Sequence, residues 1–421
     1  MTETPTTTPG RENRAPGAYR PPQSQHATQN PRTSQVGQKP AEEAKEPSTP
    51  PLGISPDWSK EIQDAARKMF DHLRANYVFS RDKSSYWRRT HDGTFAQTPQ
   101  EDLKRHLMKE GFQVMAQMVP GQIGSARLFD EAIVFLQNHC FVTSVFNISG
   151  HRPGILRTRE GKSVLVPDGM RPLNPSPGDC GETLQFLFDL LGESQLPYFL
   201  AWMKAALEDY ASGKPDGWRS SHMLGLVGPA GCGKSMLQTL ISEWLNGGEA
   251  DPYDMLIGSD RGRFNQDLAN AAHWRMEDKA PIHKMSQRLS YSENVKHCCV
   301  TRTLNIEAKG RDKIQLPTFR RLTISCNEES EAQTNLPYLN EGIRDKLIIL
   351  QCSKVGTLSA DYHANITRFR NEMPAFLHYL MKEHVVPPEL KEGGERMGFR
   401  EYINPDICLL YTSPSPRDRT R

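Results

Sequence analysis

The sequence lacks any apolar run long enough to cross a membrane. A transmembrane helix needs roughly 18 consecutive apolar residues, whereas only 37% of this chain is hydrophobic and its apolar stretches are short. The first residues, MTETPTTTPGRENRAPG, contain no apolar core of a secretory signal. The eight cysteines show neither a CxxC pair nor a repeated spacing, so nothing indicates a disulfide framework. We expect a cytoplasmic protein without a membrane partner.

The chain also lacks an excess of one charge, with 52 Lys and Arg against 50 Asp and Glu. Residues 408–421, which begin CLLYTSPSPRD, resemble the translation of a transposase adapter used in DNA library preparation. We therefore expect a sequencing artefact that lies outside the fold. Without its three arginines and one aspartate, the chain holds 49 basic and 49 acidic residues. Evidence for a nucleic-acid partner must then come from local clusters, not from net charge.

Aromatic residues are almost absent from the first 51 residues, which contain ten prolines and one aromatic, Tyr19. This composition predicts a disordered tail over residues 1–55. A small mixed α+β domain is then predicted over residues 56–180. Its expected elements are two short strands at NYVFS and SYWRR, helices over residues 99–110 and 127–139, and a Gly-rich hairpin between residues 149 and 169. We predict a second domain over residues 181–385, which contains the candidate catalytic residues. A C-terminal segment, residues 386–407, follows it.

The clearest motif follows two predicted helices, which are broken near Gly192, and a short apolar strand over residues 223–227. It matches GxxxxGKS, and its residues are Gly228, Pro229, Ala230, Gly231, Cys232, Gly233, Lys234 and Ser235. Glycines let backbone N–H groups converge on phosphate oxygens, the lysine reaches the β and γ phosphates, and the serine hydroxyl binds Mg²⁺. A second GKS at residues 161–163 has Leu156 in place of the first glycine, and we expect a surface turn there.

A site that hydrolyses a nucleoside triphosphate also needs carboxylates for the metal and for the attacking water. The best candidates are Glu277 and Asp278, which follow the moderately apolar segment AAHWRM. A solvated charge pair on a loop is the alternative. Asn327 ends the alternating segment RRLTISC, where its amide could polarise water or contact the γ-phosphate, or could simply begin a turn.

Together these motifs resemble the superfamily 3 helicases of viruses and phages, an AAA+-like group. The resemblance is closest to the helicase half of phage and poxvirus-type primase-helicases, and it covers about residues 140–385. In that family, as in this chain, a phosphate loop precedes an acidic pair, a basic hairpin, an Asn-ending strand and an arginine. The resemblance implies an α/β fold with a P-loop NTPase core on a central parallel sheet, a helical collar and a lid.

The resemblance further implies an ATP-dependent DNA helicase of viral or phage replication, in the host cytoplasm if phage-encoded. Such a helicase is a homo-hexameric ring that hydrolyses ATP with Mg²⁺ at subunit interfaces and translocates on single-stranded DNA or a forked duplex. The upstream primase domain that often accompanies this family is missing, so any priming would come from a separate primase. The main alternative is a nucleotide-gated AAA+ switch or loader without processive unwinding. A P-loop kinase is a third possibility, but it has no use for the hairpin or the Asn-ending strand.

The resemblance also assigns roles to individual residues. Glu277 would help Ser235 to hold Mg²⁺, Asp278 would activate water, and Asn327 would be the sensor of the γ-phosphate. Arg344 would be an arginine finger that completes the site of a neighbouring subunit. The alternatives for Arg344 are a surface ion pair with Asp345 or Glu341, and Lys346 as the residue that acts in trans.

A local basic cluster between residues 302 and 321 is the candidate for nucleic-acid binding, and it contains Arg302, Lys309, Arg311, Lys313, Arg320 and Arg321. The segment IEAKGRDKIQL has Gly310 between apolar flanks, which predicts a hairpin with Lys309, Arg311 and Lys313 near its tip. In the family the equivalent hairpin lines the central pore, where these residues would contact phosphates without sequence specificity. A solvated charged turn is the alternative.

Overall fold

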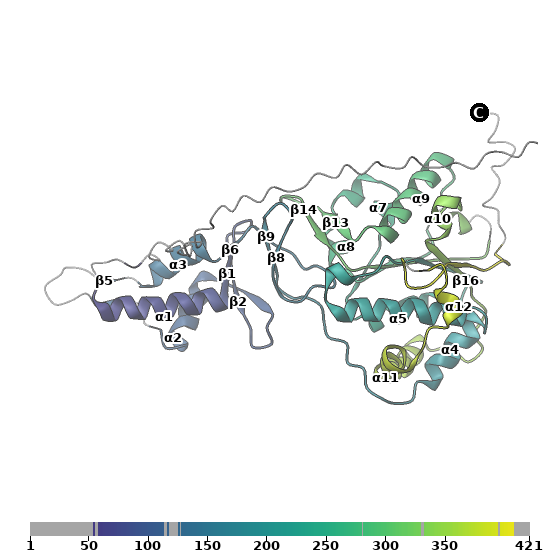
Figure 1. Cartoon of the computed structure of the whole chain (residues 1–421), viewed down its shortest axis with the longest axis horizontal. Helices are drawn as coiled ribbons and strands as arrows, with labels where there is room; N and C mark the ends of the chain where they lie inside the picture. Colours follow the sequence, from purple (N-terminus) through teal and green to yellow (C-terminus); the bar gives the residue numbers. More distant parts are fainter. Residues whose placement is uncertain are drawn as a thin grey trace, which may run out of the picture. The chain divides into compact units, whose positions relative to one another are not determined.

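The computed structural model describes residues 54, 58–112, 116–117, 125–126, 128–279, 281–329, 332–394 and 396–407. The chain divides into two units, Met1–Pro50 and Pro51–Arg421, and all described residues belong to the second. Apart from Ile54, the predicted tail lies outside the described residues, as does the predicted adapter segment 408–421. The fold is mixed α/β (Figure 1). Within the described parts, no helix combines the length and apolarity needed to span a bilayer.

The first elements form a small α+β module, as the sequence predicts. Its sheet has the strand order β3-β2-β1-β6, in which β1 and β2 are the antiparallel pair expected from NYVFS and SYWRR. Its strands are β1 (Tyr77–Ser80), β2 (Ser85–Arg89), β3 (Phe95–Thr98) and β6 (Phe141–Val142). Its helices are α1 (Lys60–Asn76), α2 (Gln100–Lys109) and α3 (Leu128–His139). The predicted helices over residues 99–110 and 127–139 are therefore confirmed.

Two smaller sheets complete the N-terminal half. The antiparallel pair β8–β9 is the hairpin predicted between residues 149 and 169, and β7 pairs with β9 in parallel. The strands are β4 (Ala116–Gln117), β5 (Ser125–Ala126), β7 (Ser144–Val145), β8 (Gly154–Arg157) and β9 (Ser163–Val166). Phe146 and Val164 pack in the same apolar cluster as residues of the large sheet described next.

The second half is built on a six-stranded sheet of order β11-β12-β15-β10-β16-β17, and every neighbouring pair is parallel. The strands are β10 (Met223–Val227), β11 (Glu249–Ala250), β12 (His273–Met276), β15 (Arg321–Cys326), β16 (Leu347–Gln351) and β17 (Tyr402–Ile403). β10 lies between β15 and β16 and is buried along its whole length. The carboxyl ends of β10, β12, β15 and β16 therefore meet at one edge, where open parallel sheets bind their ligands.

Helices cover both faces of this sheet. Successive strand residues point to opposite faces, so Leu224 and Leu226 of β10 pack in one apolar cluster and Met223 and Val227 in the other. Figure 1 shows α4, α5 and α11 on one side of the sheet and α7, α9 and α10 on the other.

The helices of this half are α4 (Gly181–Leu191), α5 (Leu196–Ser212), α6 (Lys234–Leu245), α7 (Tyr253–Leu256), α8 (Gln266–Asn270), α9 (Met285–Val300), α10 (Glu341–Arg344), α11 (Tyr362–His378) and α12 (Pro388–Lys391). α4 and α5 are the predicted pair, broken at Gly192, which is the C-cap of α4. An antiparallel hairpin, β13 (Thr303–Ile306) and β14 (Ile314–Pro317), precedes β15 and confirms the hairpin predicted around Gly310.

Buried histidines make the stability of this half depend on pH. His273 in β12 is fully buried between the hydroxyls of Ser242 and Thr323, and burial lowers its pKa to about 3. An unfolded histidine titrates near pH 6.5. Between these values the unfolded chain binds a proton that the native chain does not, so stability falls as the pH drops below about 6.5.

We expect the free energy of unfolding to fall by about 2 kcal/mol between pH 6.5 and pH 5, because His273 is protonated in the unfolded chain but not in the native one. Urea unfolding at pH 7 and pH 5, on the wild type and on His273→Gln, measures the effect. The variant should lose less stability than the wild type over that interval. An equal loss in both proteins would show that the proton binds elsewhere.

Candidate functional site

The turn over residues 228–235 connects the end of β10 to the start of α6. Gly233 caps α6 with φ +120°, a conformation that L side chains rarely adopt. At Gly228 an added Cβ would lie 2.4 Å from the carbonyl oxygen of Cys352, so only glycine fits. The first N–H groups of α6 have no acceptor within the helix. The turn therefore presents unpaired donors and the positive end of a helix dipole, a combination that favours an anion.

Lys234 is buried, and its ammonium group returns to the turn. Its Nζ donates to the carbonyl oxygens of Gly228 at 2.7 Å and Pro229 at 2.9 Å, and to Oδ1 of Asn327 at 3.1 Å. Asn327 reaches this position because β15 runs parallel to β10, with Cys326 opposite Val227. Lys234 is therefore held at the turn by two backbone carbonyl groups, the Asn327 amide and the sulfur of Cys232, to which its Nζ donates at 3.9 Å.

A cavity of about 640 Å³ opens beside this turn. The residues from the predicted site that line it are Ala230, Gly231, Gly233, Lys234, Ser235, Glu277, Asp278 and Asn327. They come from the carboxyl ends of three different strands and from the start of α6. The structure therefore brings the lysine, the serine, the acidic pair and the asparagine to one cavity.

The two carboxylates of the acidic pair have different surroundings. Glu277 forms an ion pair with Arg275, and the same guanidinium nitrogen donates to the carbonyl oxygen of Ser235 at 3.2 Å. Glu277 and Ser235 are therefore neighbours. Asp278 has no hydrogen bond or ion pair among the described residues, and its charge helps to raise the pKa of the nearby Cys326 thiol, after burial. Asp278 is thus the open carboxylate of the cavity.

Several residues of the cavity were not predicted. Lys354, Leu358, Ser359, Tyr362 and Asn365 line it. Lys354 follows the end of β16, the neighbour of β10, and the same strand-end rule that pointed to Asn327 could have found it. Tyr362 opens α11 and donates to the Thr239 hydroxyl at 3.1 Å, so α11 borders the cavity, consistent with core or lid packing.

Arg344 lies away from this cavity. It ends α10, immediately before β16, and so stands at the edge of the sheet opposite the strand ends that line the cavity. Its side chain is exposed and forms no ion pair with another described residue. Asp345 pairs with Lys346 instead, and Lys346 is buried. Of the two candidates for action on another subunit, only Arg344 is exposed.

The hairpin presents two of its three predicted contacts to solvent. Lys309 and Lys313 are exposed and form no ion pair within the described part of the chain. Arg311 does not lie free at the tip, contrary to the prediction. Its side chain is only 9% exposed, pairs with Asp82 at 3.3 Å and donates to the carbonyl oxygen of Val145 at 2.5 Å. Its charge is already neutralised, so we remove it from the candidate phosphate contacts.

Two further arginines of the basic cluster are also buried. Arg320 donates to backbone carbonyl groups, including that of Cys298, and lies over the Trp274 ring at 5.0 Å. Arg321 pairs with Asp209 at 2.7 Å, and burial lowers its pKa to about 10. The local excess of basic residues in the sequence therefore overstates the positive charge of the surface.

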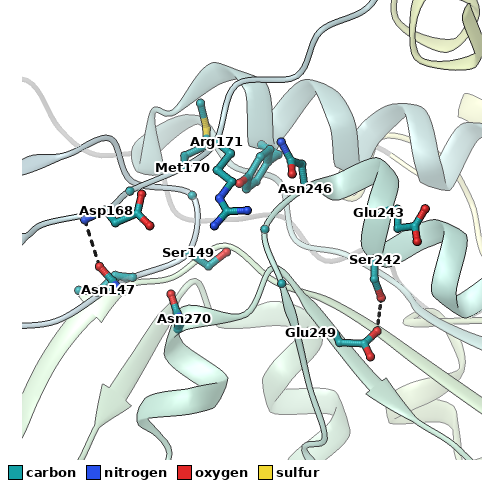
Figure 2. A pocket seen from close by; sticks show the side chains of 16 residues that line it. Asn147, Ser149, Asp168, Met170, Arg171, Ser242, Glu243, Asn246, Glu249 and Asn270 are labelled. Carbon is teal, nitrogen blue, oxygen red and sulfur yellow. Dashed lines mark hydrogen bonds between the residues drawn. The ribbon is translucent and has the colours of Figure 1, made fainter. Parts of the chain in front are cut away.

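A second cavity, of about 390 Å³, lies where β11 and β12 begin (Figure 2). Figure 2 shows Ser149, Arg171 and Asn270 pointing toward its middle. Asn246, the C-cap of α6, lines it as well. The carboxyl end of a helix carries partial negative charge, and Asp168 adds a carboxylate to the lining. A triphosphate is therefore better accommodated by the larger cavity, at the amino end of α6.

Comparisons with known proteins give little information on function. Residues 226–340 match a family described as "Family of unknown function (DUF5906)", and comparison with curated proteins finds no match. Two solved structures of the NrS-1 C-terminal region are 14% and 13% identical, with TM-scores of 0.49 and 0.46. Each alignment covers 75% of this chain, and 69% and 68% of the respective neighbour.

A third similar structure is that of "SCCmec type IV Cch - active helicase". It is 13% identical, with a TM-score of 0.29, and the alignment covers 72% of this chain and 57% of that one. TM-scores at these levels do not establish a shared fold. We therefore base a functional proposal on the residues of the larger cavity and of the hairpin.

Proposed function

We propose that this chain is a P-loop ATPase of AAA+-like architecture that works as a DNA helicase in viral or phage replication. One observation carries the proposal: a single cavity gathers Lys234, Ser235, Glu277, Asp278 and Asn327 at the amino end of α6. This set contains the cation, the hydroxyl, the carboxylates and the amide that phosphoryl transfer from ATP requires.

Each residue has a role that fits its position. The turn over residues 228–235 binds the phosphates through backbone N–H groups, and Lys234 exchanges its present acceptors for the β and γ phosphates. Asp278, the open carboxylate, orients and deprotonates the attacking water. Asn327, beside Lys234, contacts the γ-phosphate and detects its loss. Lys354, which also lines the cavity, adds a cation that the sequence did not predict.

The donors available for a metal suit Mg²⁺. Ser235 and Glu277 offer hard oxygen atoms, are close together and lie in the cavity, and Mg²⁺ prefers one or two carboxylates combined with substrate phosphates. A Mg²⁺ ion held by Ser235 and Glu277 would supply positive charge next to the transferred phosphoryl group. Arg275 must release Glu277 for this role, and Glu249 is an alternative partner that already accepts from Arg275 at 3.1 Å.

The exposed lysines of the hairpin would bind DNA, and Arg344 would contact a neighbouring subunit. Lys309 and Lys313 bind the phosphates of single-stranded DNA or of a fork, in a manner that does not depend on sequence. Because Arg344 lies at the sheet edge opposite the cavity, it can serve only the site of another copy. A ring of identical subunits, a homo-hexamer, satisfies this requirement. The expected location is the host cytoplasm, and a separate primase would supply primers.

Strand displacement on a forked duplex tests the proposal, with Arg344→Ala mixed into wild-type protein. If subunits share sites, the variant lowers the activity of the mixture more than dilution predicts, because one variant subunit disables its neighbour's site. Glu341→Ala, on the same short helix, is the matched control and should act only as a diluent. ATP hydrolysis without strand displacement would favour the nucleotide-gated loader. Activity that falls only in proportion to dilution would contradict shared sites.

A further inference from the structure

Three buried thiols lie in or next to the turn over residues 228–235. Cys232 belongs to the turn, Cys326 ends β15 and Cys352 follows β16, and all three side chains are buried. The N–H group of Cys352 donates to the carbonyl oxygen of Val227 at 2.6 Å. An added Cβ at Gly228 would lie 2.9 Å from the Cβ of Cys352. Cys352 is therefore packed against the base of the turn that carries Cys232.

Cys232 and Cys352 belong to the same buried cluster, and their thiols interact with each other. Nζ of Lys234 donates to Sγ of Cys232 at 3.9 Å. The interaction with Cys352, followed by the charge of Lys234, lowers the pKa of Cys232 to about 6. The same interaction, together with burial, raises the pKa of Cys352. At neutral pH the pair therefore holds one thiolate and one thiol, the combination that disulfide formation needs.

We propose that Cys232 and Cys352 are a redox modification site, at which a peroxide oxidises the two thiols to a disulfide that prevents nucleotide binding. The thiolate of Cys232 attacks one oxygen of hydrogen peroxide, the O–O bond breaks, and a sulfenic acid forms with release of water after proton uptake. The sulfur of Cys352 then attacks the sulfur of Cys232, loses its proton and displaces the sulfenic oxygen as a second water. Two thiols are oxidised and one peroxide is reduced to two waters.

The disulfide would act on the turn itself. It would fix the turn to the end of β16 and remove the negative charge of the sulfur beside Lys234. The N–H groups and the lysine of this turn must rearrange when phosphates bind, and the disulfide would oppose that rearrangement. This consequence rests on the proposed nucleotide site, whereas formation of the disulfide does not. Ala230 and Gly231, the two residues that precede Cys232 in the turn, are exposed. A small opening of this glycine-rich turn therefore admits a peroxide, and bound ATP should oppose that opening.

Peptide mapping under non-reducing conditions, on full-length chain treated with hydrogen peroxide, tests the site. We expect peptides that contain residues 232 and 352 to be joined, the linkage to form more slowly with Mg²⁺ and ATP, and dithiothreitol to reverse it. ATP binding should be lost on oxidation and regained on reduction. Separate peptides after peroxide treatment, or a linkage from Cys232 to Cys326 instead, would overturn the proposal.

Two variants complete the experiment. Cys352→Ser should abolish the linkage and leave Cys232 as the sulfenic acid, which dimedone traps. Cys299→Ala should leave the linkage unchanged, because Cys299 is also buried but its carbonyl oxygen accepts from the N–H group of Ser221, just before β10 and away from the turn. If the reduced wild type never binds ATP while the linkage still forms, the proposed function fails and the modification site stands. If reduced protein binds ATP and no linkage forms, the modification site fails and the proposed function stands.

Discussion

Replacing Lys234 with alanine should lower ATP hydrolysis at least about 100-fold, the usual effect of removing a charged contact to a transition state. The side chain already lies in the turn, held by the carbonyl oxygens of Gly228 and Pro229 and by Asn327. No other lysine or arginine lies within this turn. Loss of the lysine therefore removes the cation nearest to the expected β and γ phosphates. Phosphate release at saturating ATP and Mg²⁺ measures the effect.

The chain provides a matched control in its second GKS sequence. Lys162 stands in the same tripeptide but lies in the turn between β8 and β9, where it pairs with Asp312 at 3.3 Å. Lys162→Ala should leave hydrolysis within about twofold of wild type, since surface pairs contribute little. Circular dichroism would show whether either variant is unfolded. If the Lys234→Ala variant is folded and hydrolyses ATP normally, ATP must bind at another site.

The double variant Lys309→Ala/Lys313→Ala should retain basal hydrolysis but lose its stimulation by single-stranded DNA. Both lysines lie in the loop between β13 and β14, outside the cavity lining. Removing each phosphate contact should also reduce the slope of log affinity against log salt by about one. Hydrolysis with and without DNA, and DNA affinity at several salt concentrations, measure the two effects.

Lys60→Ala/Lys68→Ala is the control for this experiment. It removes two exposed lysines of α1 and so changes the net charge equally. We expect DNA stimulation and the salt slope to stay as in wild type. If both double variants weaken DNA binding to the same extent, the hairpin has no special role. If the hairpin variant alone loses basal hydrolysis, hydrolysis and DNA contact reside in the same residues.

The sequence predicted the elements that local rules determine. The apolar segment before Gly228, the helix after it and the hairpin around Gly310 are all present. The common location of Lys234, Asp278 and Asn327 was expected from the family resemblance, which implied a parallel sheet, and the carboxyl ends of parallel strands meet at one edge. For these elements, the periodicity of apolar side chains and the conformational preference of glycine are sufficient to predict the local structure.

Pairings between distant parts of the chain could not be predicted in this way. Arg311 and Lys313 are two residues apart and look equivalent in sequence, yet Arg311 is neutralised by Asp82 from the turn between β1 and β2. Arg275 made β12 look poorly apolar, but Glu249 and Glu277 compensate its charge. Which basic residues remain free depends on tertiary contacts that sequence spacing does not encode.

The most direct measurement for the central claim is hydrogen exchange of backbone amides with and without Mg²⁺ and a slowly hydrolysed ATP analogue. If the triphosphate binds at the amino end of α6, peptides over residues 228–237 should become protected, together with those that contain Asp278 and Asn327. Peptides around Ser149 and Asn270, at the second cavity, should not change. Protection at the second cavity alone, or no protection anywhere, would contradict the nucleotide site proposed for this chain.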